Sequence, residues 1–261
     1  MIGMPSISEP LARETAALLD DSNLFSRNGL TADPFQSEIL SFDGRGLLVC
    51  CARQTGKSTA VAALAGQHAL RTDEATILMA APSERQAREL LRGVKRLLRG
   101  ASYTDEIVND GVMSLELRNG ARIIALSAAA LDGVRGYSDI SLLVADEAAF
   151  IPREFFAVIA PMIAVSARAR FVCLSTPNGR DNWFSDRWHD GSNDWTRISW
   201  RAEQCPRIKT EFLAAQRREL GERLFKQEYL CECVTEGDAP AFDLELIQNS
   251  IRPMGTLMLH A

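Results

Sequence analysis

Five short runs of apolar residues, each four to seven residues long and separated by polar or helix-forming stretches, dominate the hydrophobic pattern of the chain. Continuous apolar runs of this length, rich in Val, Ile and Leu, are typical of strands that are buried on both faces. Helical patterns lie between several of them, and alternation of strands and helices favours a largely parallel, covered sheet. The predicted strands are 46–51, 76–80, 122–126, 141–146 and 170–175.

Other patterns fill in the organisation. Segments 112–117 and 121–126 flank Arg118-Asn119-Gly120, and Asn-Gly is a strong hairpin signal, so we expect an antiparallel piece in the sheet. Asp33-Pro34-Phe35-Gln36 predicts the start of a short helix. No internal repeat or low-complexity tract is visible. We predict four regions: an N-terminal arm (1–30), an α/β core (31–203), a small lid of two amphipathic helices that meet near Gly221 (204–235), and a linker or tail (236–261).

Composition narrows the class of protein. The chain has 261 residues, of which 46% are hydrophobic, so it is long enough for one large α/β domain with a sizeable core. Its formal net charge is -5, so contacts with nucleic acid would need a local basic patch. The basic residues are 25 Arg and only 4 Lys. Arginine suits bidentate contacts with phosphate, although such a bias can equally reflect the base composition of a genome.

The cysteines and histidines indicate no structural metal. Six cysteines form no Cys-x-x-Cys pair, and the three histidines lie far apart in the sequence. Cys50, Cys51 and Cys173 sit in apolar runs, where cysteine acts as a small hydrophobic residue. We therefore expect a reducing compartment. No signal peptide and no run of 18 apolar residues appears, so we expect a protein without a membrane partner.

The segment 50–59 carries the clearest chemical signal. It reads Cys-Cys-Ala-Arg-Gln-Thr-Gly-Lys-Ser-Thr, and it connects a predicted strand to an Ala-rich helix. Backbone N–H groups of such a turn can hold a polyphosphate, with Lys57 reaching the β- and γ-phosphates and Ser58 binding Mg²⁺. The strict P-loop motif fails at one position, because Cys51 stands where the first glycine belongs. A bare Gly-Lys-Ser could be only a helix start, but the flanking strand and helix favour a nucleotide site.

A second segment, residues 141–148, supports the first. It is an apolar run that ends in Asp146 and Glu147. In a P-loop protein Asp146 would hold Mg²⁺ and Glu147 would polarise the attacking water. The alternative is that the two acids only stabilise the start of the next helix. Their position downstream of a P-loop favours the catalytic interpretation.

Two polar segments could complete the site. Ser175, Thr176 and Asn178 follow the strand 170–175, at the end where α/β folds place ligands, and could sense the γ-phosphate. The alternative is an ordinary turn, because Pro-Asn-Gly is a strong turn former. Gln36 could read adenine through its amide while Phe35 packs on the base. It could equally be a surface glutamine at a helix start.

Two basic features suggest contacts with charge. Arg135 sits between glycines in a loop twelve residues before Glu147, where it could act as an arginine finger or be a solvated loop charge. Residues 83–100 carry basic side chains at spacings of three and four, which places them on one broad face of a helix. Such a stripe suits the phosphate backbone of DNA, and a solvated face fits the pattern equally well. The tentative DNA-binding residues are Arg88, Arg92, Lys95, Arg96 and Arg99.

Taken together, these segments resemble the ATPase domain of a tailed-phage large terminase. The similarity is carried by Pro34-Phe35-Gln36, residues 52–58, Ala81-Pro82-Ser83 with Gln86, Arg135-Gly136, residues 144–150, Ser175 to Gly179 and residues 225–229, in the expected order. The resemblance implies a P-loop NTPase of the RecA-like (ASCE) type, with a mainly parallel sheet, flanking helices and a small helical lid. It also implies that the missing first glycine is not unusual.

The resemblance also implies roles for individual residues. Gln36 would contact adenine and Arg53 would touch the phosphates, while Arg135 would act across a subunit boundary. Ser175, Thr176 and Asn178 would couple hydrolysis to motion. The catalytic residues would be Glu147, Arg135, Lys57 and Arg53. The ATP-binding residues would be Phe35, Gln36, Arg53, Gln54, Thr55, Gly56, Lys57, Ser58 and Thr59, with Mg²⁺ held by Ser58 and Asp146.

The expected function is ATP-driven packaging of double-stranded viral DNA into a procapsid. The resemblance implies a homo-oligomeric ring, a portal protein and a small terminase subunit as partners, and a location in the host cytoplasm, transiently at the portal. Alternatives are a superfamily-two-like helicase or translocase and an ATP-dependent structural switch with little turnover. The family usually continues into an RNase H-like nuclease domain. Asp243 and Glu245 lack the further carboxylates that such a site needs, so we expect no nuclease activity from this chain.

Overall fold

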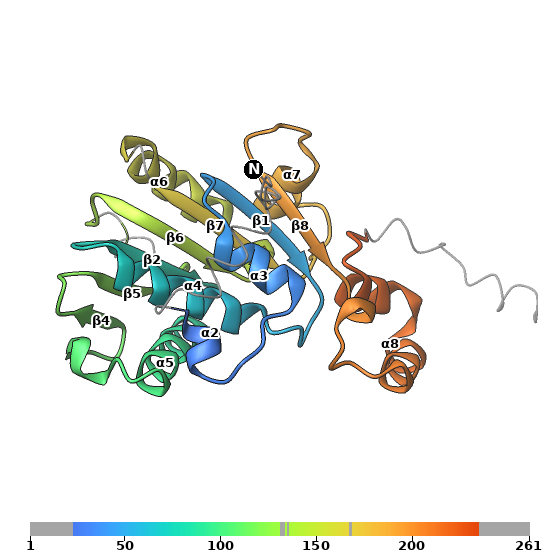
Figure 1. The fold of residues 1–261 in the computed structure, drawn as a ribbon. Helices are drawn as coiled ribbons and strands as arrows, with labels where there is room; N and C mark the ends of the chain where they lie inside the picture. The colour runs from blue at the N-terminus through green and yellow to red at the C-terminus, as the bar shows by residue number, and fades with distance from the viewer. Residues whose placement is uncertain (1–22, 131–133, 135, 167–168, 235–261) are drawn as a thin grey trace, which may run out of the picture.

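The computed structural model describes residues 23–130, 134, 136–166 and 169–234. Over these residues the chain forms one eight-stranded sheet with the order β3-β4-β5-β2-β6-β7-β1-β8. In this spatial order the strands β5, β2, β6, β7, β1 and β8 run parallel to one another. The strands β4 and β3 add an antiparallel piece at the β5 edge. Figure 1 shows the helices on both faces of this sheet. The strands are β1 (Gly46–Cys51), β2 (Thr76–Ala81), β3 (Ile107–Asp110), β4 (Ser114–Leu117), β5 (Arg122–Ser127), β6 (Ile140–Asp146), β7 (Arg170–Ser175) and β8 (Thr196–Trp200).

The five predicted strands are confirmed as β1, β2, β5, β6 and β7, and the predicted hairpin is confirmed as the antiparallel pair β4–β5. The sequence prediction missed β3 and β8. Both are edge strands, and each buries few side chains: Ile198 is the one buried residue of β8, and β3 has none. Without the alternating or continuous burial that marks an inner strand, their hydrophobic pattern is too weak to detect.

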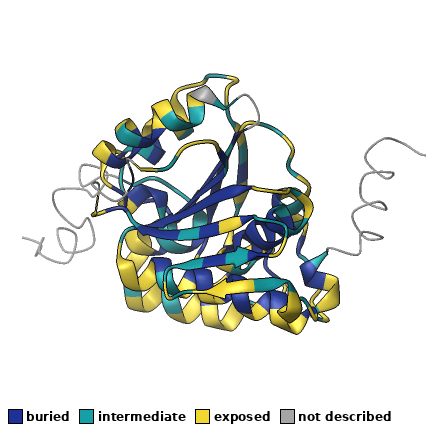
Figure 2. Cartoon of the chain, turned by 90° about the vertical axis from the view of Figure 1, so that its left-hand side faces the viewer, coloured by how far each residue is buried: buried dark blue, intermediate teal, exposed yellow. Residues whose placement is uncertain are grey.

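The helices divide between the two faces because successive residues of a strand point to opposite sides. In β1, Leu47 and Val49 join the core under the helices α3, α4 and α5, whereas Leu48 and Cys50 join the core under α6 and α7. Figure 2 shows buried strands between helices whose outer faces are exposed. The helices are α2 (Leu24–Arg27), α3 (Pro34–Ser41), α4 (Lys57–Arg71), α5 (Glu84–Gly100), α6 (Arg153–Val165), α7 (Trp183–His189) and α8 (Thr210–Leu230), with short 3-10 turns η1 (Thr104–Glu106), η3 (Ala148–Phe150) and η4 (Ala202–Gln204).

The lid is formed by α8, which lies beyond the edge strand β8 (Figure 1). Its helical path is broken at Gly221, which has φ 72° and ψ 163°, as the sequence predicted for two helices that meet there. Leu213, Phe225 and Tyr229 bury their side chains against Ala52 and Ala202. Because Ala52 is the first residue after β1, the lid packs directly on the start of the loop that carries the Gly-Lys-Ser sequence.

Candidate nucleotide site

The loop between β1 and α4 turns through two residues with positive φ values. Gln54 and Gly56 have positive φ values of 60° and 91°, and the Thr55 hydroxyl donates a hydrogen bond of 2.9 Å to the Ala52 carbonyl. A side chain at position 56 would be strained because of the φ of 91°, and its Cβ would also lie 2.7 Å from Nε2 of Gln36, which would have to shift. The turn therefore favours glycine at position 56. It leads directly into the N-terminus of the 15-residue helix α4, whose free N–H groups can bind an anion.

Cys51 explains why the strict motif can fail at its first glycine. The residue is still part of β1, is fully buried, and pairs in register with Trp200 of β8. A residue in a strand has no need of a positive φ, so a small buried side chain is tolerated there. Burial raises the pKa of the Cys51 thiol to about 12, which keeps it neutral.

Two predicted catalytic residues, Lys57 and Glu147, and the two predicted metal ligands, Ser58 and Asp146, meet at the carboxyl ends of β1 and β6. Ser58 Oγ donates a hydrogen bond of 3.0 Å to Asp146 Oδ2, and Lys57 Nζ lies 2.7 Å from Glu147 Oε1. Glu147 follows β6 directly and has φ 53°, which turns the chain sharply into η3. The structure thus brings together four residues from two segments that lie 88 positions apart along the chain, as the sequence motifs predicted.

The charges of this cluster are strongly coupled. Burial and the neighbouring Glu147 raise the pKa of Asp146 to about 6. Burial acts to lower the pKa of Lys57, but the nearby carboxylates, Glu147 above all, and the hydrogen bond to Glu147 outweigh burial and raise it. Lys57 is therefore firmly cationic, as a residue that binds phosphate must be.

Two carboxylate oxygens of the cluster have no partner. Oδ1 of Asp146 and Oε2 of Glu147 are buried without a hydrogen bond in the part of the chain that the structure describes. Unpartnered buried carboxylate oxygens are costly in a protein that contains nothing to satisfy them. Oxygen donors from a serine and an aspartate suit Mg²⁺, so Ser58 and Asp146 fit the predicted metal ligands.

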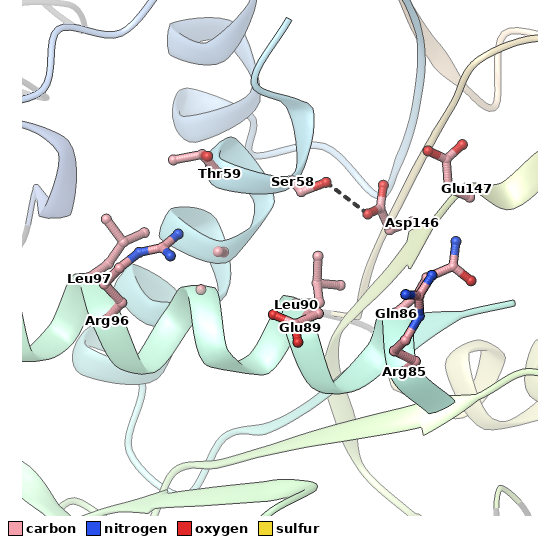
Figure 3. A pocket seen from close by; sticks show the side chains of 12 residues that line it. Ser58, Thr59, Arg85, Gln86, Glu89, Leu90, Arg96, Leu97, Asp146 and Glu147 are labelled. Atoms are coloured by element: carbon pink, nitrogen blue, oxygen red, sulfur yellow. Dashed lines mark hydrogen bonds between the residues drawn. The ribbon is translucent and has the colours of Figure 1, made fainter. Parts of the chain in front are cut away.

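A cavity of about 460 Å³ opens beside this cluster. Figure 3 shows Ser58, Asp146 and Glu147 on one wall and side chains of α5 on the other. Arg85 and Gln86, from the first turn of α5, point toward the side where the two acids lie (Figure 3). The predicted site residue Thr59 and the α5 residues Glu89 and Arg96 also line the cavity.

One of the two predicted adenine contacts, that of Phe35, needs correction. Phe35 is fully buried and stacks on Trp200, with ring centroids 5.1 Å apart, so neither of its faces is free for a base. Gln36 is also buried, and both ends of its amide are used. Its Oε1 accepts from the backbone N–H of Asp33 at 2.9 Å, and its Nε2 donates to the Gly56 carbonyl at 3.1 Å. In this structure Gln36 ties the start of α3 to the P-loop, and its contact with adenine stays a prediction.

Arg53 lies on the exposed side of the loop and contacts the lid. Its backbone N–H donates to the Glu228 carbonyl at 3.1 Å, and its Nε lies 3.6 Å from the Glu228 carboxylate. The sequence prediction missed Glu228 as a neighbour of the site, and it also missed Arg207, which contacts both Asp33 and Thr55. Neither contact has a local signal, because the partners lie more than 150 residues apart.

The predicted coupling residues lie beside the turn that follows Glu147. Ser175 Oγ accepts a hydrogen bond of 3.1 Å from the backbone N–H of Ala149, and Asn178 Nδ2 donates to the Ala149 carbonyl at 3.4 Å. Thr176 is buried next to them. These residues therefore hold the backbone two positions after the predicted base, an arrangement through which a change at Glu147 could reach β7.

The basic stripe on α5 is less uniform than predicted. Lys95 is buried and lies 2.5 Å from the Asp110 carboxylate, so the prediction that it belongs to an exposed face is wrong. Arg99 pairs with the same Asp110, a residue of the β3–β4 hairpin that the sequence prediction did not place beside α5. Arg88 pairs with Glu84 and Arg92 with Glu89. Arg96 is exposed on the wall of the cavity.

Some predictions lie outside the described residues. Arg135, the predicted finger, is one of them, as are Asp243 and Glu245 and the N-terminal arm through residue 22. Within the described ranges no helix is long and apolar enough to cross a membrane. In the same ranges no group of three or more His, Cys, Asp or Glu side chains has the arrangement of a metal site built from protein ligands alone.

Comparison with solved structures identifies the same fold in phage packaging proteins. The ATPase domain of the large terminase of Thermus phage P74-26 superposes with a TM-score of 0.70 at 22% identity, over 80% of this chain and 97% of that one. A large terminase from a thermophilic bacteriophage, in complex with ADP, gives 0.66 at 15% identity, over 78% of this chain and 54% of that one. The HK97 bacteriophage large terminase gives 0.60 at 17% identity, over 84% of this chain and 50% of that one.

The chain thus spans about half the length of the last two proteins. No curated protein sequence matches it. Residues 48–248 match the family described as terminase large subunit, T4likevirus-type, N-terminal. This match covers more than half of the chain and includes the loop between β1 and α4, Asp146, Glu147 and α8. The chain therefore belongs to the family of terminase large subunits, of which it carries the N-terminal region.

Proposed function

We propose that this chain is the ATP-hydrolysing motor domain that drives double-stranded viral DNA into a procapsid. The observation that carries the proposal is the meeting of Lys57, Ser58, Asp146 and Glu147 at one edge of a mainly parallel sheet, beside a glycine-bearing phosphate loop. Two comparisons support an adenine nucleotide as the ligand of this chain: its membership of the terminase family, and the ADP complex of a structurally similar large terminase.

The residues divide the chemistry between them. Lys57 would exchange its contact with Glu147 for the β- and γ-phosphates, because a polyphosphate offers it more negative charge than one carboxylate. That exchange would free the Glu147 carboxylate to accept a proton from an attacking water. Bound Mg²⁺, held by Ser58 and Asp146, would neutralise charge that develops on the phosphate oxygens.

Three further roles and the partners of the motor are part of the proposal. Arg135 would stabilise the transition state from a neighbouring subunit of a ring, and Arg53 would contact the phosphates from the loop itself. Ser175, Thr176 and Asn178 would pass the state of the site to β7 through Ala149, which two of them hold by hydrogen bonds. A portal protein and a small terminase subunit would be the partners of the assembled motor.

The DNA-binding face is the least constrained part of the proposal. Surface ion pairs of the kind formed by Arg88, Arg92 and Arg99 are weak, so phosphates could replace the carboxylates. Arg96 is exposed and needs no such exchange. Lys95 drops out of the proposal because it is buried. Replacing Arg96 with Ala should lower the salt dependence of DNA binding by about one phosphate contact.

Turnover measured against protein concentration, with and without double-stranded DNA, tests the proposed function. A ring motor with a finger in trans predicts that activity per chain rises as the chains assemble. Mixing the Arg135→Ala and Glu147→Gln variants, each inactive alone, should then restore some activity. Turnover that is independent of concentration would indicate a monomeric helicase-like enzyme. ATP binding without turnover under any of these conditions would indicate a structural switch and contradict the motor.

A further inference from the structure

Arg207 makes three polar contacts that none of the predicted roles uses. It lies between η4 and α8, at the start of the lid. Its two terminal nitrogens form a bidentate pair with Asp33, at 2.9 and 2.6 Å, and Nη2 also donates to the Thr55 carbonyl at 2.8 Å. The carboxylate of Asp33 is buried, so this pair is better shielded from water than an ordinary surface ion pair. An arginine just before α8 thus binds a backbone carbonyl of the loop between β1 and α4.

A second donor reaches the next carbonyl of the same loop. Gln36, which forms a capping box with Asp33 at the start of α3, donates its amide N–H to the carbonyl of Gly56. Asp33 therefore links both donors: its carboxylate holds Arg207, and its backbone N–H holds the Gln36 oxygen at 2.9 Å. Two consecutive carbonyls of the loop, Thr55 and Gly56, are bound from outside by one connected network.

The geometry of the peptide group gives these contacts a consequence. In a planar trans peptide the C=O and the following N–H point in opposite directions. Binding of the Thr55 carbonyl by Arg207 therefore orients the N–H of Gly56 toward the opposite side of the loop. The N–H of Lys57 is oriented by α4 itself, because the Gly56 carbonyl also accepts the first hydrogen bond of that helix, from the N–H of Ala60 at 3.2 Å. These are groups of the kind that hold phosphate oxygens in a P-loop.

We propose that Arg207 is a positioning residue for the phosphate cradle, which orients the Gly56 N–H toward the nucleotide's diphosphate by holding the Thr55 carbonyl. The proposal rests on nucleotide binding as the proposed function. Because Arg207 lies three residues before the first residue of α8, the cradle is complete only while the start of the lid stays in place. Both terminal nitrogens of Arg207 are already engaged, which separates this role from a direct contact with phosphate.

The test compares nucleotide binding by Arg207→Ala, Arg207→Lys and Arg218→Ala. Arg218 is the matched control, since it is exposed on α8 and forms no salt bridge within the described residues. We expect Arg207→Ala to weaken binding of ADP and of ATP alike, each by about 10-fold, the effect of one charge-assisted hydrogen bond. Arg207→Lys, which can keep one of the contacts, should lose less, and Arg218→Ala should match the unmodified chain.

Kinetics and a double substitution distinguish positioning from simple destabilisation. The KM for ATP should rise while kcat at saturation stays within about two-fold, because the cradle holds ground state and transition state equally. Asp33→Asn should act in the same direction, and the double variant with Arg207→Ala should be little worse than Arg207→Ala alone. Unfolding curves of each variant show whether it is folded at the assay temperature. If Arg207→Ala is unfolded at that temperature, Arg207→Lys replaces it in the binding and kinetic measurements.

The outcomes separate this proposal from the proposed function. ADP affinity unchanged in Arg207→Ala, or additive losses with Asp33→Asn, would overturn the positioning role while leaving the nucleotide site intact. An equal loss in Arg218→Ala would also overturn it, since the effect would then be one of lid charge. If the unmodified chain binds neither ADP nor ATP, the proposed function itself fails.

Discussion

Polar clusters stand at both ends of the parallel strands, and they differ in how completely their hydrogen bonds are made. At the carboxyl ends, Asp146 and Glu147 each keep one buried oxygen without a partner in the described structure. At the amino ends, Arg170 donates to the Phe42 carbonyl at 2.7 Å and to His68 Nδ1 at 2.6 Å. His68 in turn contacts Ser141 Oγ at 2.9 Å, and that hydroxyl donates to the Thr76 carbonyl.

The chain of bonds at the amino ends is complete. Arginine can only donate, so His68 Nδ1 must accept, its Nε2 carries the proton and donates to Ser141 Oγ, and the Ser141 hydroxyl donates to the Thr76 carbonyl. Burial and the charge of Arg170 lower the pKa of His68 to about 4, which agrees with a neutral ring. This network joins α4 to the first residues of three strands. The described hydrogen bonds of this cluster are made within the protein, whereas the cluster at the carboxyl ends leaves two carboxylate oxygens unpaired. With respect to hydrogen bonds, we call the amino ends the closed end and the carboxyl ends the open end.

Backbone strain does not distinguish the two ends. Gln54, Gly56 and Glu147 have positive φ at the nucleotide edge, but Glu74 and Asp139 have it at the other edge, just before β2 and β6. The difference lies in the side chains. Asp146 and Glu147 each have one oxygen paired and one oxygen without a partner in the described structure, whereas the amino-end side chains are hydrogen-bonded to one another.

The largest expected effect is on binding at the open end. Lys57→Ala should weaken ATP binding by at least about 100-fold, because the phosphates lose a buried cation. Isothermal titration of the folded variant measures this directly. Lys209→Ala, at the exposed N-cap of α8, is the matched control and should bind as the unmodified chain does. Retained affinity in Lys57→Ala would mean that the open end is not a phosphate site.

At the closed end we expect lost stability with nucleotide affinity retained. Arg170→Ala should lower the free energy of unfolding by about 2–3 kcal/mol, since it leaves the Phe42 carbonyl and a ring nitrogen of His68 without a donor. Urea titration measures the loss, and ADP affinity of the folded protein should stay within two-fold. A large fall in ADP affinity without a loss of stability would break the comparison, because it would give this end a role in binding.

The smallest effect concerns pH. The pKa of His68 is about 4 in the folded chain and close to 6.5 when unfolded, so the unfolded chain binds the proton more readily. The stabilising effect of the neutral ring is fully present above pH 6.5 and is lost as the pH falls toward 4. Between pH 7 and pH 5 this residue should account for about 1–2 kcal/mol of lost stability.

The substitution His68→Gln isolates that contribution. The introduced glutamine side chain can accept from Arg170 but does not titrate, so the variant should lose less stability than the unmodified chain between pH 7 and pH 5. Urea titrations of both proteins at the two pH values give the difference. An equal loss in both would show that other groups set the acid sensitivity.

The inner strands and the catalytic pairing could be predicted because their signals are local. Buried parallel strands are recognised in the sequence as apolar runs. Such a run is ended or followed by each of the residues Lys57, Ser58, Asp146 and Glu147. The roles of Phe35 and Gln36 could not be judged in the same way. Nothing near Phe35 in the sequence shows that Trp200 covers it, and nothing near Gln36 shows that Gly56 takes its amide.

Long-range partners explain the remaining differences. Spacing along α5 placed Lys95 on the basic face. In the structure its side chain is buried and pairs with Asp110, a residue of a hairpin that the sequence did not reveal as a neighbour. Arg207 and Asp33 are 174 residues apart, so no local pattern could pair them. Ion pairs between distant segments depend on the packing of the whole fold, which hydrophobic periodicity describes only element by element.

The central claim, that the open end of the sheet binds ATP and hydrolyses it with Glu147 as the base, is tested most directly by Glu147→Gln. Glu154→Gln is the control, because Glu154 is an exposed glutamate on α6. Each protein is incubated with ATP and Mg²⁺ under assembling conditions, and bound ATP and ADP are quantified after quenching. We predict that Glu147→Gln binds ATP with nearly unchanged affinity, holds it uncleaved and turns over at least about 100-fold more slowly, while Glu154→Gln behaves as the unmodified chain. Turnover by Glu147→Gln close to that of the unmodified chain would contradict the account.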